Sequence, residues 1–289
     1  MRARLLLHLT IVGAGLVLFG VRLHGQPTAP PTAFETVRVA DDIFVFHNPG
    51  APGNATALVT DEGVILVDAK NPVDYENVVA AVKTVSNQPI RYVISTHHHG
   101  DHTGSNPQLQ AAGAVIVASE NQRQNMIESG YSSGQPSISF EQRANVMLGG
   151  KKVELYYFGR GHTNGDIVAY FPEQRVLATG DLYVTGKGTP ELIDYAAGGS
   201  AKAWTKTLDR VLGLDFDVAI PGHGVIADKD DVRRFRDSTV ALRNRVHDMV
   251  KDQASPDEIE QMLRTEFGWG NLHVYRGLLG VIAEMRQMP

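Results

Sequence analysis

The stretch Ser95-Thr96-His97-His98-His99-Gly100-Asp101-His102-Thr103-Gly104 decides both the fold and the chemistry of this chain. Its first residue, Ser95, ends the run 91–95, a short apolar segment typical of a buried strand. Four histidines and one aspartate fall within positions 97–102. Histidines packed this closely repel one another when protonated, whereas a metal ion binds their neutral nitrogens. The stretch therefore predicts a metal site at a strand end, where the loops of α/β sheets gather functional groups.

Three later segments repeat this form, in which a ligand type flanked by glycine follows a predicted strand. His162 lies in a Gly-His-Thr-Asn-Gly-Asp turn, Asp181 follows the strand predicted over 176–178, and His223 follows the one over 218–220. Glycine lets the backbone approach a site closely. Each segment alone is common in ordinary turns. Their joint presence at strand ends makes all three residues candidate ligands.

The rest of the sequence predicts two groups of strands, each accompanied by helices. Alternating apolar runs separated by turn residues occupy 37–68, and a second strand group lies between 153 and 220. Helical spacing follows each group, whereas residues 129–142, rich in Ser, Gly and Pro, predict a loop. This order favours an α+β sandwich of mixed sheets covered by helices, with the last three helices as a cap on one edge.

The N-terminus predicts an export signal. Arg2 and Arg4 precede an apolar run over 5–21. We expect residues 1–25 to be a signal peptide or an uncleaved N-terminal anchor, the chain's one link to a membrane. Residues 26–33 then form a linker, and residues 34–289 form one domain whose helical part spans 228–289. The catalytic part would be exported, either to the periplasm or into the medium.

Composition narrows the classes of ligand. The 289 residues carry a formal net charge of −5 and no polybasic segment, which argues against nucleic acid as a partner. The chain has no cysteine, so neither a thiolate ligand nor a thiol nucleophile exists. A metal site built only from histidine and carboxylate points to zinc, with iron or manganese as alternatives.

The motif His-x-His-x-Asp-His over 97–102, followed by His162, Asp181 and His223, resembles the metallo-β-lactamase superfamily. The resemblance runs from about residue 37 to residue 225. Asp68, at the end of a predicted strand, matches the family's earlier acidic motif, an aspartate that supports the metal loop. The resemblance implies a four-layer αβ/βα sandwich with C-terminal helices.

The resemblance also implies a ligand assignment. His97, His99 and His162 would hold a first zinc ion, Asp101, His102 and His223 a second, and Asp181 would bridge both. A metal-bridging hydroxide would then attack a carbonyl of a small-molecule substrate, and Asp101 would guide the proton as a catalytic residue. His98 alternates with the ligands and is expected to point away from them.

The branch of the family is indicated by Asp181. Antibiotic-degrading members usually carry cysteine on the second metal or serine at the position of Asp181, whereas an aspartate there is similar to the glyoxalase II, lactonase and related branches. We therefore expect hydrolysis of an ester, thioester, lactone or amide bond. An exported metallo-β-lactamase and a mononuclear iron persulfide dioxygenase stay open as alternatives. So do a nuclease, which the charge balance disfavours, and a non-catalytic metal-binding module.

The sequence suggests several further residues near the substrate. The candidate pocket residues are Tyr131, Tyr183, Lys187, Tyr195, Trp269 and Tyr275.

Overall fold

The computed structural model describes residues 34–47, 53–186 and 192–288. The predicted signal or anchor over 1–25 and the linker over 26–33 lie outside these residues. Within the described residues, no helix combines the length and the apolar character that a membrane span requires.

The first sheet has seven strands in the order β1-β2-β3-β4-β5-β6-β7. Its first four strands form an antiparallel meander, and β4 to β7 run parallel. The strands are β1 (Glu35–Arg38), β2 (Ile43–His47), β3 (Ala55–Val59), β4 (Val64–Val67), β5 (Ile90–Ile94), β6 (Val115–Ser119) and β7 (Ile138–Phe140). The helices of this half are α1 (Tyr75–Val85), α2 (Gly100–Thr103), α3 (Asn106–Ala111) and α4 (Glu120–Glu128), and a 3₁₀ turn, η1 (Pro72–Asp74), precedes α1.

The second sheet has six strands in the order β13-β12-β11-β10-β9-β8. All neighbours are antiparallel except β11 and β12, which run parallel. The strands are β8 (Arg143–Leu148), β9 (Lys151–Tyr156), β10 (Val168–Phe171), β11 (Val176–Ala178), β12 (Val218–Ile220) and β13 (Ala227–Asp228). A 3₁₀ turn, η2 (Gly180–Leu182), follows β11.

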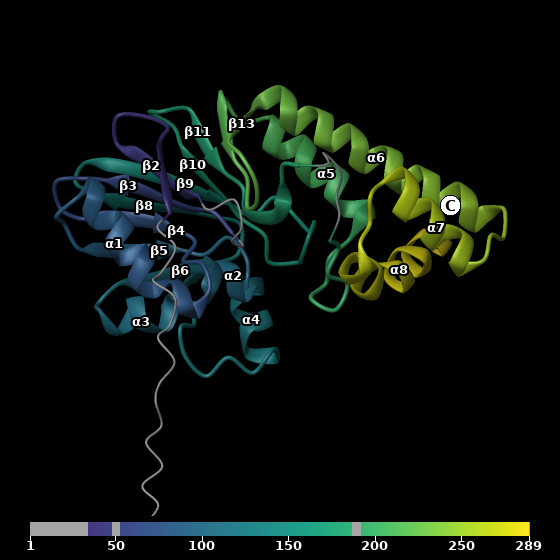
Figure 1. Cartoon of the computed structure of the whole chain (residues 1–289), viewed down its shortest axis with the longest axis horizontal. Helices are drawn as coiled ribbons and strands as arrows, with labels where there is room; N and C mark the ends of the chain where they lie inside the picture. Colours follow the sequence, from purple (N-terminus) through teal and green to yellow (C-terminus); the bar gives the residue numbers. More distant parts are fainter. Residues whose placement is uncertain (1–33, 48–52, 187–191, 289) are drawn as a thin grey trace, which may run out of the picture. The chain divides into compact units, whose positions relative to one another are not determined.

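Alternation along the strands places successive side chains in different cores. Val45 and Ile65 of the first sheet join the core between the sheets, whereas their neighbours Phe46 and Leu66 join the core beneath α1 and α3. In the second sheet, Ala169 and Phe171 face the core between the sheets, while Val168 and Tyr170 face the C-terminal helices. Figure 1 shows α1 and α3 on one side of the strands and α5 to α8 on the other. The expected four-layer sandwich with C-terminal helices is therefore confirmed.

The C-terminal helices are α5 (Ala201–Leu212), α6 (Lys229–Lys251), α7 (Pro256–Glu266) and α8 (Asn271–Arg286). Ser200 caps α5, since its hydroxyl accepts from the amide of Ala203, and Ser255 caps α7 in the same way. Helix α6 begins at β13, the edge strand of the second sheet, and packs against both α5 and α8.

Three strands were not predicted, β7, β8 and β13. All three are edge strands, and edge strands bury few side chains. Strand β7 has no buried residue and β13 has only two residues, so neither carries a clear strand pattern. In β8, Ala144, Val146 and Leu148 do occupy alternate positions and pack in the core between the sheets, so this strand was missed although its pattern is present in the sequence. Strand β7 lies within residues 129–142, for which we predicted a loop, so that prediction was wrong over Ile138–Phe140.

Candidate metal centre

The loops that follow four strands deliver the seven candidate ligands to one place. His97 and His99 lie in the turn after β5, and the one-turn helix α2 carries Asp101 and His102. The other three follow strands of the second sheet: His162 after β9, Asp181 in η2 after β11, and His223 after β12. The donor atoms form two groups, His97–His99–His162–Asp181 and Asp101–His102–His223. The structure thus brings together all seven residues singled out from the sequence.

The first group turns three imidazole nitrogens toward one point. Nδ1 of His99 lies 3.2 Å from Nε2 of His97 and 2.9 Å from Nε2 of His162. The Oδ2 atom of Asp181 lies 3.5 Å from Nε2 of His162 and 3.8 Å from Nε2 of His97. His97 and His162 are each 1% exposed, so these two rings are shielded from solvent.

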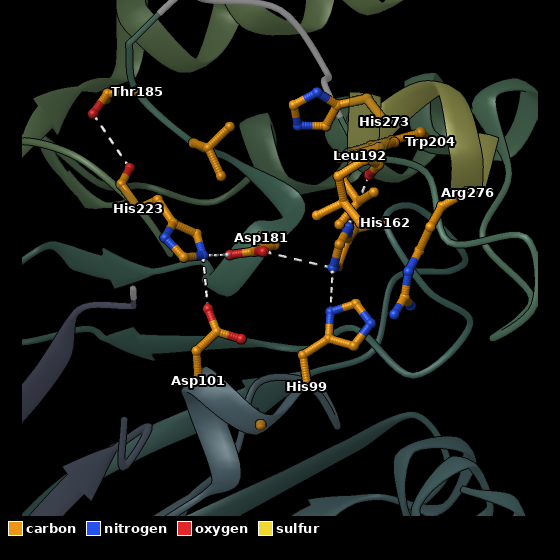
Figure 2. A pocket seen from close by; sticks show the side chains of 13 residues that line it. His99, Asp101, His162, Asp181, Thr185, Leu192, Trp204, His223, His273 and Arg276 are labelled. Carbon is orange, nitrogen blue, oxygen red and sulfur yellow. Dashed lines mark hydrogen bonds and ion pairs between the residues drawn. The ribbon is translucent and has the colours of Figure 1, made fainter. Parts of the chain in front are cut away.

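The second group meets the other oxygen of Asp181. Oδ1 of Asp181 lies 3.3 Å from Nε2 of His102 and 3.3 Å from Nε2 of His223. Oδ2 of Asp101 lies 3.4 Å and 3.2 Å from the same two nitrogens. The two imidazole nitrogens are 3.4 Å apart. Asp181 therefore contributes one oxygen to each group, as Figure 2 shows at the centre of the cavity.

These separations fit metal ions. A tetrahedral zinc ion with ligands at about 2.0–2.1 Å holds neighbouring donor atoms about 3.3–3.4 Å apart. The second group matches this spacing closely, and the first group scatters around it. Oδ1 of Asp181 is buried and, among the described residues, makes no well-formed hydrogen bond, which is costly for a carboxylate unless a cation faces it. The donor set of imidazoles and carboxylates can thus hold two divalent ions.

The electrostatics of the two groups differ. Burial lowers the pKa of His97 well below its usual value and that of His162 to about 4, so both rings stay neutral and keep a free lone pair. In the second group, attraction to Asp181 raises the pKa of His223 to about 9. Burial alone would raise the pKa of Asp181, but His223 and His102 hold it well below its usual value. The second group therefore attracts positive charge, supplied either by protons or by a metal ion.

Neighbouring side chains fix the orientation of the ligands, which metal sites generally require. Asp68 accepts hydrogen bonds from the amide and the hydroxyl of Thr96, both at 2.8 Å, and faces Nδ1 of His102 at 2.8 Å. Asp166 accepts from the amide and hydroxyl of Thr163 and so braces the loop of His162. Asp68 thus lies where a support for the metal loop was expected.

One supporting residue was not anticipated. Nε2 of His99 lies 2.9 Å from Oδ2 of Asp194. The same oxygen accepts a hydrogen bond from Nη1 of Arg276 at 2.6 Å. The other oxygen of Asp194 accepts from the amides of Ala196 and Ala197, at 3.1 and 3.3 Å. No motif surrounds Asp194 in the sequence, so nothing marked it as a candidate. His98, expected to point away, is absent from the two ligand groups, although it lies near Asp194 and His99 in a third group of potential donor atoms.

A cavity of about 540 Å³ opens beside the two groups, as Figure 2 shows. Its lining is His99, Gly100, Asp101, His162, Asp181, Val184, Thr185, Leu192, Trp204, His223, Leu272, His273 and Arg276. None of the candidate pocket aromatics belongs to it. Tyr183 packs against Phe235 in the core, Trp269 is buried, and Tyr275 is 86% exposed on α8. Tyr195 binds Glu284, Tyr131 binds the carbonyl of His98, and Lys187 lies outside the described residues.

Comparison with known proteins gives one consistent result. The family model described as "Metallo-beta-lactamase superfamily" matches residues 48–223. A protein named metallo-β-lactamase type 2 from Bacillus sp. (strain 170) is 27% identical over 68% of this chain and 76% of its own length. The α subunit of a 2,4-dinitroanisole O-demethylase from Nocardioides sp. is 31% identical over 58% of this chain and 51% of its own length.

The solved structures agree on the fold. A structure titled metallo-β-lactamase from Pontibacter korlensis superposes with a TM-score of 0.63, at 24% identity, over 72% of this chain and 99% of that chain. The matched residues 48–223 contain all seven candidate ligands, whereas the helices α6 to α8 lie beyond them.

Proposed function

The chain belongs to the metallo-β-lactamase superfamily and is a metal-dependent hydrolase, and from this premise we propose that it is a dinuclear zinc enzyme cleaving an ester, thioester, lactone or amide bond of a small molecule. The observation that carries the proposal is the position of Asp181. Its two oxygens face different groups of donor atoms, and each group contains enough ligands for one ion.

The proposed ligands follow from the distances. His97, His99 and His162 would hold the first ion, and Asp101, His102 and His223 would hold the second. Asp181, with one oxygen toward each group, would contribute to both sites. When bound, zinc ions lower the pKa of a coordinated water molecule to about 7 and act as Lewis acids that polarise a carbonyl oxygen.

Asp101 is proposed to act on the proton of the attacking water. Its Oδ2 atom faces His102 and His223, while its side chain is 23% exposed and lines the cavity. A carboxylate that contacts both the ligand group and the open cavity can accept a proton there and release it to solvent. Asp181, by contrast, is 10% exposed and faces nitrogens on both sides.

The substrate is proposed to be small and not a nucleic acid. The cavity has a volume of about 540 Å³, and four apolar side chains contribute to its lining, those of Val184, Leu192, Trp204 and Leu272. A formal net charge of −5 provides no electrostatic attraction for a phosphate backbone. We further propose, from the sequence of residues 1–25, that the enzyme is exported.

The test combines metal analysis with a substrate panel. Purified protein should contain two zinc ions per chain and should hydrolyse at least one ester, thioester or lactone. Exhaustive chelation should abolish the activity and zinc should restore it. His162→Ala should abolish it as well, whereas His247→Ala should not, because His247 lies on α6 and belongs neither to the ligand groups nor to the cavity lining. Activity that survives complete removal of metal would contradict the proposal.

The same panel decides between this function and its alternatives. Turnover of a chromogenic cephalosporin alone would indicate a β-lactamase. One bound iron, with oxygen consumption and sulfite formation from glutathione persulfide, would indicate a dioxygenase. The intact second group of Asp101, His102 and His223 favours the two-metal hydrolase, since a mononuclear enzyme has no need of it.

A further inference from the structure

Helix α8 contributes to the cavity although it lies outside the segment shared with the family model. Its residues Leu272, His273 and Arg276 form part of the lining. Figure 2 shows the guanidinium of Arg276 beside the ring of His99, on the side of the cavity opposite His223. The C-terminal helices therefore supply part of the substrate site as well as a cover for the sheet.

Arg276 stands out chemically among the described lining residues. It is the only lysine or arginine among them. Most other residues there are either candidate metal ligands or apolar side chains such as Trp204 and Leu272. Its side chain is 42% exposed, and among the described residues its guanidinium, which carries five N–H donors, binds only Oδ2 of Asp194, at 2.6 Å. The remaining donors are available to an anion in the cavity.

The negative charge of Asp194 does not prevent Arg276 from binding an anion. Asp194 already accepts hydrogen bonds from His99 and from two backbone amides, so its negative charge is shared among several donors. The contact instead holds the guanidinium in place. When one N–H of an arginine is held by a hydrogen bond, the other N–H groups of its planar guanidinium can still form two parallel hydrogen bonds to a carboxylate.

Helix α8 is itself held firmly against the site. Glu284 accepts from the hydroxyls of Tyr195 and Ser200 and from the amide of Lys202, so it ties α8 to the start of α5. Gly280 lies against the ring of Tyr195, where an added Cβ would come within 2.2 Å of ring carbons. Arg276 thus projects from a positioned helix, and a preorganised donor loses less entropy on binding.

We propose that Arg276 is a specificity-determining residue that binds a carboxylate of the substrate. The scissile acyl group then lies at the two ligand groups, and the apolar part of the substrate lies against Leu272 and Trp204. This inference rests on the proposed hydrolase function and narrows its substrates to small acyl compounds that carry a negative charge.

The experiment compares two esters of equal chain length with zinc-loaded protein. Mono-p-nitrophenyl glutarate carries a terminal carboxylate, and p-nitrophenyl valerate is its neutral counterpart. In Arg276→Gln, KM for the glutarate ester should rise about 10- to 100-fold, the range for hydrogen bonds to a charged group. Its kcat and the kinetics of the valerate ester should stay close to wild type. Arg276→Lys should retain part of the preference for the anion.

The control variant is Arg286→Gln, which removes an exposed arginine from the last turn of the same helix and should change neither ester. Calorimetry gives an activity-independent readout, because Arg276→Gln should weaken the binding of free glutarate by a similar factor. An equal loss of kcat for both esters would overturn the inference, since Arg276 would then act through Asp194 as a positioning residue. Unchanged kinetics and unchanged glutarate binding would overturn it too.

The two proposals fail separately. Hydrolysis of both esters without any preference for the anion in the wild type rejects the role of Arg276 and leaves the hydrolase intact. If zinc-loaded protein hydrolyses neither these two esters nor any other substrate of the panel, the proposed hydrolase is rejected, while glutarate binding still decides the role of Arg276. Should Arg276→Gln fold poorly, wild-type selectivity and the Arg276→Lys variant decide it.

Discussion

Nε2 of His99 and Oδ2 of Asp194 lie 2.9 Å apart, although 95 positions separate the two residues in the chain. Because Nε2 donates to this carboxylate, Nδ1 of the same ring keeps its lone pair and faces His97 and His162. Burial would raise the pKa of Asp194, but the hydrogen bond from His99, the backbone amide of Ala197 and the positive charge of Arg276 hold it below its usual value. The carboxylate therefore stays ionised and sets the orientation of a proposed ligand.

The first prediction concerns this contact. Asp194→Asn keeps the shape of the side chain but removes its charge. We expect zinc affinity to fall about 10- to 100-fold, as is typical when a partner of a ligating histidine is lost. Titration with a competing zinc chelator measures the change. Asp209→Asn, an exposed residue that pairs with Arg236 on the surface, is the matched control and should bind zinc like the wild type. Equal zinc affinity in both variants would contradict the role assigned to Asp194.

The grouping of the candidate ligands could be predicted from the sequence because each follows a strand. Residues 97–102 are contiguous, so their proximity needs no knowledge of the fold, and the end of a strand marks where His162, Asp181 and His223 will lie. Asp194 and Arg276 carry no such mark. One lies in an irregular loop and the other on α8, and only the packing of that helix against residues 192–200 brings them together.

The aromatic candidates failed for a related reason. Tyr183 is two positions from Asp181, yet the turn η2 directs its ring into the core against Phe235. Trp204 is buried in the core, and its indole donates to the carbonyl of Leu182, yet it also contributes to the lining of the cavity. Proximity along the chain fixes where a backbone passes but not where a side chain points.

The second prediction uses two glycines beside the ligands. In Gly222→Ala, the new Cβ would lie 2.0 Å from Oδ1 of Asp181 and 2.6 Å from the backbone of Gly180. The carboxylate must move, so we expect a loss of at least one zinc ion and destabilisation by about 1–3 kcal/mol, the usual cost of overpacking. Metal analysis and thermal unfolding measure both effects.

Gly100→Ala is the matched control for that substitution. Its Cβ would meet only the hydroxyl of Tyr131, at 3.8 Å, which is an ordinary contact. We expect full zinc content and a change in stability within about 0.5 kcal/mol. Similar behaviour of the two variants would mean that crowding at Asp181 does not control the metal content.

The third prediction separates metal binding from proton transfer. Asp101→Asn should keep the first zinc ion, because the residues of the first group do not include Asp101. Zinc content should fall toward one ion per chain, and kcat should fall about 10²- to 10⁴-fold if proton transfer is lost as well. Excess zinc distinguishes the two effects, since it can refill a weakened site but cannot replace a proton acceptor. Full activity of the variant at two ions per chain would contradict both roles.

The last prediction concerns Lys70, whose side chain is wholly buried behind the second ligand group. Its ammonium donates to the carbonyl of Gly53 at 2.6 Å and lies 4.4 Å from the centre of the Phe34 ring. Burial lowers its pKa from 10.5 to about 8, although nearby aspartates oppose the shift. Between these two pH values the unfolded chain binds more protons than the folded one, so the free energy of unfolding should rise with pH.

Lys70→Met removes this titration. Relative to the variant, the wild type should gain stability as the pH rises from about 8 toward 10.5, by up to about 3 kcal/mol at 1.36 kcal/mol per pH unit. Its relative stability should be lowest, and constant, below about pH 8. Urea unfolding at a series of pH values measures the difference. Lys151→Met is the matched control, because Lys151 also donates to a backbone carbonyl, that of Val59, but from a more exposed position. Parallel profiles for the wild type and Lys70→Met would contradict the prediction, since they would mean that the buried ammonium titrates alike in both states.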